Sequence, residues 1–298
     1  MDNLLKIVKK KKIAYAEHAD LAEYSTFHIG GPGDLLVFPK TSDELLVLAA
    51  IRIQENIPYV IIGGGSNILI SDEGFRGLVI IPRFLDISMH DNSMTAGASV
   101  GLQNLLQFSV QQGLSGLEHL VGIPGSVGGA LAGNAGTSTH WIESAVVSVT
   151  AVNMLTAKQE IFSKSQCAYA YRSSLFKDSE ERLIVEGNFV LTPKPASEIQ
   201  NVMKQYLSHR NKQPAGGSSA GCVFKNPLEI PAGKLIDELG LKGKQIGKVQ
   251  ISLDHGNFML NMGGAHATDV IKLISYVKQQ ARDKRGIQLQ EEIHYIGF

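Results

Sequence analysis

Short apolar runs alternate with helical patterns through the first quarter of the chain. DLLVFPK (34–40) has the length and composition of a strand, and TSDELLVLAAIRIQENI (41–57) has the apolar spacing of a helix. Thr41 or Ser42 would cap this helix, because acidic residues follow in its first turn. PYVIIGGGSNILI (58–70) predicts a buried strand, a glycine loop and a second strand. The segment therefore predicts a β-α-β beginning.

Strand-like pieces dominate from about residue 76. They are GLVIIP (77–82), SMTAGAS (93–99), VVSVTAVNML (146–155) and RLIVEGNFVL (182–191), interrupted by the helical stretch 102–120. A third region follows residue 200, with a helix in AGKLIDELGL (232–241), strands near VQISLDHGNFMLN (249–261) and a long amphipathic helix over 269–286 that ends at Gly286. The pattern predicts an α+β fold in three parts, 1–75, 76–200 and 201–298.

Composition limits the classes of function. Lys plus Arg and Asp plus Glu both number 28, so the formal net charge is zero. We therefore expect no nucleic-acid partner and no attraction to an anionic membrane. The 298 residues, 44% of them hydrophobic, can bury a sizeable core. The nine histidines form no metal-ligand spacing, so we expect no structural metal.

The basic run VKKKK (8–12) invites comparison with a signal peptide. The following IAYAEHADLAEY contains Glu, His and Asp instead of an apolar stretch, so a solvated basic first turn is the better interpretation. No window approaches the ~18 apolar residues of a membrane span. The two cysteines, Cys167 and Cys222, lie in different settings, which favours free thiols in a reducing cytoplasm.

Two glycine-rich loops are candidates for holding a phosphate-bearing cofactor. The first loop, GGGSN (63–67), allows a ligand to approach the backbone closely and offers N–H donors. The second loop, GLEHLVGIPGSVGGALAGNAG (116–136), would start a helix after Pro124 or Ser126. Neither matches a Walker or a Rossmann pattern, and an ordinary tight turn is the alternative for the first. The candidate cofactor-binding residues are Gly63, Gly64, Gly65, Ser66, Asn67, Gly122, Pro124, Gly125, Ser126, Gly128, Gly129 and Asn134.

Seven ordered motifs resemble one family over nearly the whole chain. They are STFHIGGP (25–32), IGGGSNIL (62–69), GIPGSVGGALAGNAG (122–136), YAYRSSLFK (169–177), SAGCVFKNP (219–227), AGKLIDELGLKG (232–243) and LQEEIHYIG (289–297). The chain resembles the UDP-N-acetylenolpyruvoylglucosamine reductases, in their shorter subtype. The resemblance implies a vanillyl-alcohol-oxidase type FAD-binding fold in two subdomains and a C-terminal substrate-binding domain.

The same resemblance implies the chemistry. The family reduces the enolpyruvyl ether of UDP-N-acetylglucosamine to the lactyl ether of UDP-N-acetylmuramate, with FAD as cofactor and NADPH as co-substrate, in the bacterial cytoplasm. Another flavin oxidase of this fold, or a non-catalytic binder of FAD and a UDP-sugar, is the alternative.

Three residues match the catalytic positions of the family. Arg172 would meet the negative charge of the enolate, and Cys222 would protonate it, where most members have serine. A thiol has an ordinary pKa of ~8.5 and is a stronger acid than an alcohol. Glu292, rather than its neighbour Glu291, matches the last catalytic position and would orient the substrate carboxyl or assist protonation. Cys167 is expected to be a small buried hydrophobic residue.

Substrate contacts are expected from the same part of the chain. Lys225 and Asn226 lie next to the thiol, and Lys212 in HRNKQP would pair with the diphosphate or carboxylate of the substrate.

Overall fold

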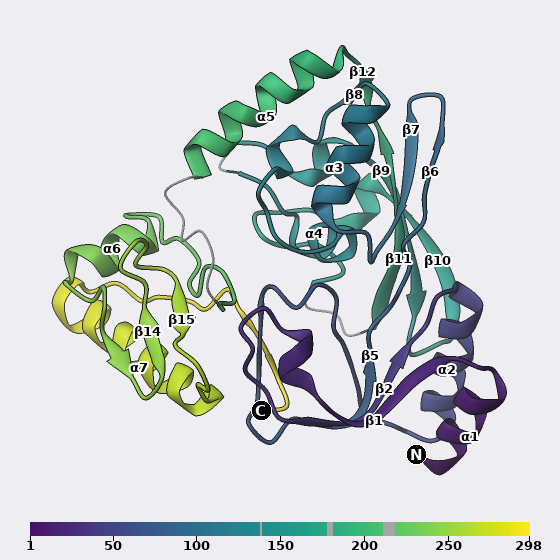
Figure 1. The fold of residues 1–298 in the computed structure, drawn as a ribbon, viewed down its shortest axis with the longest axis horizontal. Helices are drawn as coiled ribbons and strands as arrows, with labels where there is room; N and C mark the ends of the chain where they lie inside the picture. The colour runs from purple at the N-terminus through teal and green to yellow at the C-terminus, as the bar shows by residue number, and fades with distance from the viewer. Residues whose placement is uncertain (138, 178–180, 211–217) are drawn as a thin grey trace. The chain divides into compact units, whose positions relative to one another are not determined.

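The computed structural model describes residues 1–137, 139–177, 181–210 and 218–298, and Figure 1 shows the order of the elements. The chain divides into two compact units. Unit 1 consists of Met1–Glu17, Leu35–Gly64 and Gly77–Arg210, and unit 2 consists of His18–Asp34, Gly65–Arg76 and Asn211–Phe298. Each unit is therefore assembled from segments that are distant in the sequence. The predicted division into three consecutive domains stays a prediction.

Unit 1 contains a five-stranded antiparallel sheet of order β10-β9-β11-β7-β6. Its strands are Lys158–Ser163, Val146–Asn153, Arg182–Val190, Ser93–Gly97 and Ile87–His90 in that order. The helices α3 (Leu102–Gln111), α4 (Val127–Gly133) and α5 (Ala196–Arg210) belong to the same unit. A Cβ at Gly187 of β11 would lie 2.7 Å from Cδ1 of Leu131 on α4, so the glycine lets this side chain pack directly against the strand.

A four-stranded sheet has the order β1-β2-β5-β3, formed by Ala14–Asp20, Pro32–Phe38, Phe75–Ile80 and Tyr59–Ile61. The strands β3 and β5 are parallel. The helix α2 (Ser42–Gln54) begins after Thr41, whose Oγ1 accepts the N–H of Glu44 at 3.2 Å, which settles the predicted alternative between Thr41 and Ser42. The strands and helices expected in this region are confirmed.

The expectation that the N-terminal basic run forms a first turn is wrong. The helix α1 (Asp2–Lys10) contains the start of this run, so Lys9 and Lys10 occupy the last turn of the helix rather than a first turn. Cations at this end of a helix interact favourably with the partial negative charge of the free carbonyl groups. The lysines are exposed, as expected of a solvated run.

Unit 2 contains a three-stranded sheet of order β13-β14-β15, formed by Gln245–Ile246, Val249–Ile251 and Met259–Asn261. It also contains α6 (Ala232–Glu238), α7 (Ala267–Arg285) and a parallel pair between β4 (Ile68–Ile70) and β16 (His294–Ile296). The predicted helix over 269–286 is confirmed with its C-terminal cap, because Gly286 has a φ of 67°.

The N-terminus of α7 is held by a residue far away in the sequence. The carboxylate of Asp72 accepts the backbone N–H of Ala267 at 2.7 Å and that of Thr268 at 3.1 Å, and it also accepts the hydroxyl of Thr268. This side chain therefore supplies acceptors for two N–H groups that a helix start leaves without partners.

Each unit has its own hydrophobic core. The core of unit 1 includes Leu35 and Val37 of β2 and continues into the residues of the five-stranded sheet, including Val149 and Phe189. The core of unit 2 joins Phe27, Leu69 and Phe224 to the buried face of α7. The remaining short elements are η1 (Leu21–Tyr24), β8 (Leu114–Ser115), η2 (Glu118–Leu120), η3 (Ile142–Ser144), η4 (Lys164–Cys167) and β12 (Thr192–Pro193).

Two further properties concern the described residues alone. None of their helices combines the length and the apolar character needed to cross a membrane. Among the same residues, no group of three or more His, Cys, Asp or Glu side chains is arranged to hold a metal ion.

Candidate active site

Unit 1 brings the two glycine loops together. A Cβ placed on Gly64 would lie 3.0 Å from the Cα of Gly125 and 3.3 Å from the backbone N of Ser126, and one on Gly63 would lie 3.5 Å from Oγ of Ser126. Gly63 and Gly64 are exposed, and so is Gly122. Residues separated by about 60 positions in the sequence therefore form one surface of bare backbone, which suits the close approach of a flat, bulky cofactor such as FAD.

The second loop leads into α4 as predicted. Ser126 is the N-cap, and its Oγ accepts the N–H of Gly129 at 3.4 Å. Gly128 in the first turn is buried, and a Cβ there would lie 2.8 Å from that of Ala98. The Ser126 hydroxyl therefore caps the helix, while Gly128 lets α4 approach the segment after β7.

Asn134 lies at the end of α4 and connects it to the turn that carries Arg172. Its backbone is left-handed with a φ of 45°, and its buried Nδ2 donates to the Ala170 carbonyl at 3.1 Å and to Oε2 of Glu143 at 3.2 Å. The side chain of Asn134 is therefore occupied by the protein, and a contact with the cofactor stays a prediction.

Arg172 lies in a tight turn in which Ala170 and Ser173 exchange both backbone hydrogen bonds, at 3.0 and 3.1 Å. The φ of Arg172 is 55°, in the left-handed region that a residue with a side chain rarely adopts. The Lys177 ammonium donates to the Arg172 carbonyl at 2.7 Å, and the Ser174 hydroxyl donates to the carbonyl of Ala132 on α4 at 2.7 Å. These contacts fix the backbone that presents the guanidinium.

The first glycine loop is divided between the two units, because Gly65, Ser66 and Asn67 belong to unit 2. Gly65 has a φ of 66° and is buried against the carbonyl of Tyr24. Asn67 does not simply line the loop, since its Nδ2 donates to the carbonyl of Glu292 at 3.0 Å and its own carbonyl accepts the N–H of His294 at 2.9 Å. Asn67 therefore anchors the segment that carries the predicted catalytic glutamate.

Unit 2 places the thiol segment beside the glutamate segment. Phe224 and Glu291 form an antiparallel bridge, in which the Glu292 N–H donates to the Val223 carbonyl at 2.7 Å and the Lys225 N–H donates to the Gln290 carbonyl at 2.9 Å. Cys222 and Glu292 are 70 positions apart in the sequence, and the fold brings their backbones onto neighbouring extended segments. Their roles in catalysis stay a prediction.

The other edge of the thiol segment is held by Asn257, which the sequence analysis missed. The Asn257 carbonyl accepts the N–H of Val223 at 2.9 Å. Its side-chain oxygen accepts the N–H of Phe224 at 2.9 Å, and its side-chain nitrogen donates to the Phe224 carbonyl at 2.8 Å. Asn257 is 2% exposed. A polar residue between apolar ones in HGNFML was the available signal, since a buried amide must have hydrogen-bond partners.

The two neighbouring glutamates have different surroundings. Glu291 forms an ion pair with Lys278 on α7, with 2.9 Å between Oε1 and Nζ. Glu292 has its backbone N–H and carbonyl bound to Val223 and Asn67. The two residues therefore differ in the contacts that hold them, and the catalytic role of Glu292 stays a prediction.

The expected substrate-binding residues have separate positions. Asn226 is exposed, and its Oδ1 accepts the N–H of Ala232 at 3.0 Å, so it also caps the start of α6. Lys225 is half-buried and lies on the thiol segment. Lys212 lies outside the described residues. Substrate contacts from all three stay predictions.

The two thiols differ in burial. Cys167 is fully buried, its Sγ lies 3.3 Å from the carbonyl of Ser163, and burial raises its pKa, which confirms the expected structural role. Cys222 is half-buried. Neither cysteine forms a disulfide bond within the described part of the chain.

His255 lies in the turn before Asn257. Burial and then the nearby Lys242 ammonium lower the pKa of His255 below its usual range, which favours the neutral imidazole. Its Nδ1 accepts the backbone N–H of Asn257 at 3.2 Å. His255 therefore supports the turn that carries Asn257.

Comparison with known proteins identifies the family of the chain. A model described as an FAD binding domain matches residues 33–163, and a model described as the C-terminal domain of UDP-N-acetylenolpyruvoylglucosamine reductase matches residues 213–296. The UDP-N-acetylenolpyruvoylglucosamine reductase of Geotalea uraniireducens (strain Rf4) is 39% identical over 280 residues, covering 93% of this chain and 92% of that protein. The chain belongs to the UDP-N-acetylenolpyruvoylglucosamine reductase family. This membership confirms the resemblance and the FAD cofactor drawn from the seven motifs.

A solved structure supports the same assignment. The family member from Thermus caldophilus has a TM-score of 0.81 with 34% identity, covering 95% of this chain and 98% of that one. A solvent-stable cholesterol oxidase has a TM-score of 0.50 with 18% identity over 61% of this chain, a likeness of fold alone. The predicted flavoprotein fold of the vanillyl-alcohol-oxidase type is confirmed.

Proposed function

We propose that this chain reduces the enolpyruvyl ether of UDP-N-acetylglucosamine to the lactyl ether of UDP-N-acetylmuramate, with NADPH as the reductant, in the cytoplasm of a bacterium. The observation that carries the proposal is the pairing of the thiol segment with the glutamate segment inside unit 2, in a chain that belongs to the reductase family. When bound, FAD supplies the hydride for the carbon–carbon double bond.

The thiol of Cys222 is the proposed source of the proton. Addition of hydride to the terminal carbon of the enolpyruvyl group leaves negative charge on the adjacent carbon and its carboxylate. The S–H of Cys222 donates a proton to that carbon, and the resulting thiolate regains a proton from solvent. Cys222 is half-buried, in contrast to the fully buried Cys167.

Arg172 and Glu292 are the proposed partners of the substrate carboxylate. Arg172 offers a planar, permanently charged fork that matches a carboxylate and opposes the enolate charge. Glu292 orients the substrate carboxyl or assists protonation of the enolate. The tight turn around Arg172 and the two backbone hydrogen bonds of Glu292 hold each main chain in place, so little reorganisation is needed during reaction.

The cofactor is proposed to lie on the bare backbone where Gly63 and Gly64 meet Gly125 and Ser126. The first loop supplies backbone N–H groups and no side chain at Gly63 and Gly64, and the second offers Gly122 and Gly129 as further exposed backbone. A side chain at any of these positions would occupy the surface that a flat ring system needs.

The experiment is an anaerobic two-step titration. The flavin of the purified holoenzyme is bleached with NADPH, the enolpyruvyl UDP-sugar is added, and flavin reoxidation is followed in the wild type, Cys222→Ala and Cys222→Ser. We expect fast reoxidation in the wild type, a loss of about 10²–10⁴-fold in Cys222→Ala, and partial activity in Cys222→Ser. Cys167→Ala removes the other thiol and is the matched control, with reoxidation close to that of the wild type.

Each outcome has a separate meaning. Absence of flavin, or a reduced flavin that the enolpyruvyl sugar does not reoxidise, contradicts the proposed activity. Equal reoxidation by wild type and Cys222→Ala keeps the activity and rejects the thiol as the proton donor.

A further inference from the structure

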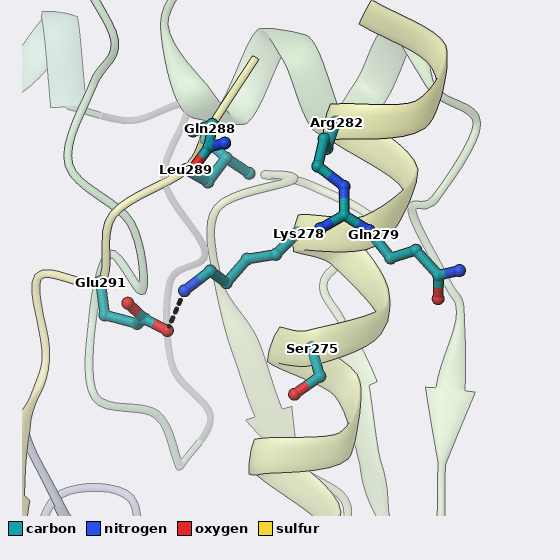
Figure 2. Close-up of a pocket in the computed structure, with 7 residues that line it drawn as sticks. All are labelled: Ser275, Lys278, Gln279, Arg282, Gln288, Leu289 and Glu291. Carbon is teal, nitrogen blue, oxygen red and sulfur yellow. Dashed lines mark hydrogen bonds and ion pairs between the residues drawn. The ribbon is translucent and has the colours of Figure 1, made fainter. Parts of the chain in front are cut away.

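A cavity of about 330 Å³ lies next to the glutamate segment in unit 2 (Figure 2). One wall is α7, and the other is the chain that leads from Gly286 toward β16. Its lining residues are Ser275, Lys278, Gln279, Arg282, Gln288, Leu289 and Glu291. Figure 2 shows Lys278 and Glu291 reaching toward one another from the two walls.

One ion pair connects the two walls. Nζ of Lys278 lies 2.9 Å from Oε1 of Glu291, and the side chains are 41% and 26% exposed. Arg282, one turn further along α7, is bound instead to its neighbour Asp283 at 3.2 Å. Among the described residues that line the cavity, the pair of Lys278 and Glu291 is therefore the charged contact that joins α7 to the glutamate segment.

Glu291 directly precedes Glu292. Backbone hydrogen bonds to Val223 and Lys225 hold the segment in an extended conformation, and they leave the rotamers of its side chains to be set by other contacts. Successive side chains of an extended segment point to opposite sides. A glutamate bound to α7 at position 291 thus directs the side chain of position 292 away from the helix.

We propose that Lys278 is a positioning residue for the reduction, acting through Glu291 to fix the orientation of Glu292. The inference rests on the proposed role of Glu292. Glu291 directly precedes the predicted catalytic position in LQEEIHYIG, so this chain would use the neighbouring side chain to orient Glu292.

The ion pair of Lys278 and Glu291 should affect the reaction rate more than the stability of the fold. A partly exposed ion pair contributes little to folding, because solvent screens it and two long side chains must be ordered. A small rotation of a catalytic side chain, in contrast, lowers the rate strongly, since reaction requires close alignment. Loss of the pair should therefore slow one chemical step in a protein that remains folded.

The test uses the holoenzyme with Lys278→Met, Glu291→Gln and the exchange variant Lys278→Glu/Glu291→Lys. We expect each single variant to slow flavin reoxidation by the enolpyruvyl sugar about 3–10-fold, with unchanged flavin reduction by NADPH and an unchanged urea midpoint. The exchange variant should recover to within about twofold of wild type. Hydrogen exchange at peptides covering 290–294 should become faster in Lys278→Met, a readout independent of turnover.

Lys272→Met is the matched control, because Lys272 is an exposed lysine of the same helix that makes no ion pair among the described residues. It should behave as wild type in both half-reactions. Wild-type reoxidation in both single variants, equal slowing of both half-reactions, or no recovery on exchange would overturn the positioning role. A Glu292→Gln variant with wild-type reoxidation would instead reject the role of Glu292 on which the inference rests.

Discussion

The side-chain amide of Asn257 pairs with the backbone of Phe224 through two hydrogen bonds, 2.9 Å from the Phe224 N–H to Oδ1 and 2.8 Å from Nδ2 to the Phe224 carbonyl. The amide thus takes the place that a neighbouring strand would occupy. Phe224 is two residues after Cys222 and fully buried, so this pairing fixes where the thiol segment runs.

Replacing Asn257 with leucine should both destabilise the protein and slow the reaction. The substitution leaves the buried N–H and carbonyl of Phe224 without partners, at a cost of about 2–4 kcal/mol in the free energy of unfolding. Urea unfolding and flavin reoxidation by the enolpyruvyl sugar measure the two effects. Asn201→Leu, on the exposed side of α5, is the control and should change neither by a measurable amount. An unchanged urea midpoint in Asn257→Leu would contradict the pairing.

Gly64→Ala should weaken FAD binding. The added methyl group would lie 3.0 Å from the Cα of Gly125, which pushes the two loops apart where the cofactor is proposed to bind. We expect roughly tenfold weaker binding, equivalent to about 1.4 kcal/mol, measured by fluorescence titration of the apoprotein with FAD. Gly101→Ala, whose methyl group would have its nearest neighbour at 3.8 Å, should retain FAD. Equal affinity in the two variants would count against this position for the cofactor.

The two cysteines should differ in reactivity toward alkylating agents. Cys167 is fully buried with a raised pKa, so little thiolate is present and the reagent has no access, whereas Cys222 is half-buried. Mass spectrometry after iodoacetamide treatment of the native protein should find label at Cys222, and at Cys167 after denaturation. The enolpyruvyl sugar should slow labelling of Cys222. Preferential labelling of Cys167 in the native protein would be incompatible with the structure.

The pH dependence of stability should include a contribution from Asp72. Burial alone would raise the pKa of Asp72, but the hydrogen bonds from the Thr268 side chain and from the backbone of Ala267 and Thr268 outweigh it, and the pKa is lowered. Stability from a lowered carboxyl pKa is present above the ordinary value of ~3.9 and is lost as the pH falls through the folded-state pKa.

Asp72→Asn should therefore reduce stability by about 1 kcal/mol at pH 7, a typical cost for a weakened helix cap, and the difference from wild type should shrink as the pH falls below 4. Thermal unfolding at pH 7 and at lower pH measures it. The control is Asp254→Asn, because the Asp254 carboxylate is exposed and forms no ion pair with the other described residues. A stability difference between wild type and Asp72→Asn that grows toward low pH would contradict this role of Asp72.

Local patterns predicted most of the helices and strands, because the spacing of apolar residues and caps such as Ser126 and Gly286 depend on neighbours in the sequence. The contact between Asp72 and the start of α7 spans 195 positions, and no local pattern distinguishes such an aspartate from an ordinary loop residue. The same holds for Asn257, which meets Phe224 across 33 positions.

The candidate site was predicted from motifs, and the motifs do not state what each side chain contacts. Asn67 and Asn134 are predicted to bind the cofactor, and the structure adds that their amides also bind Glu292, Glu143 and Ala170 of the chain itself. Motif matching finds positions that matter, while the distinction between a residue that contacts a ligand and one that supports its neighbour depends on tertiary packing.

The pairing of β16 with β4 has a consequence for how the protein is made. The N–H of Ser71, directly after β4, donates to the carbonyl of Ile296 of β16 at 2.9 Å. Domains usually fold in the order in which the ribosome produces them. Here the partner strand β16 is made long after β4, so the edge of β4 stays unpaired during much of translation and is open to association with other chains until β16 has been made.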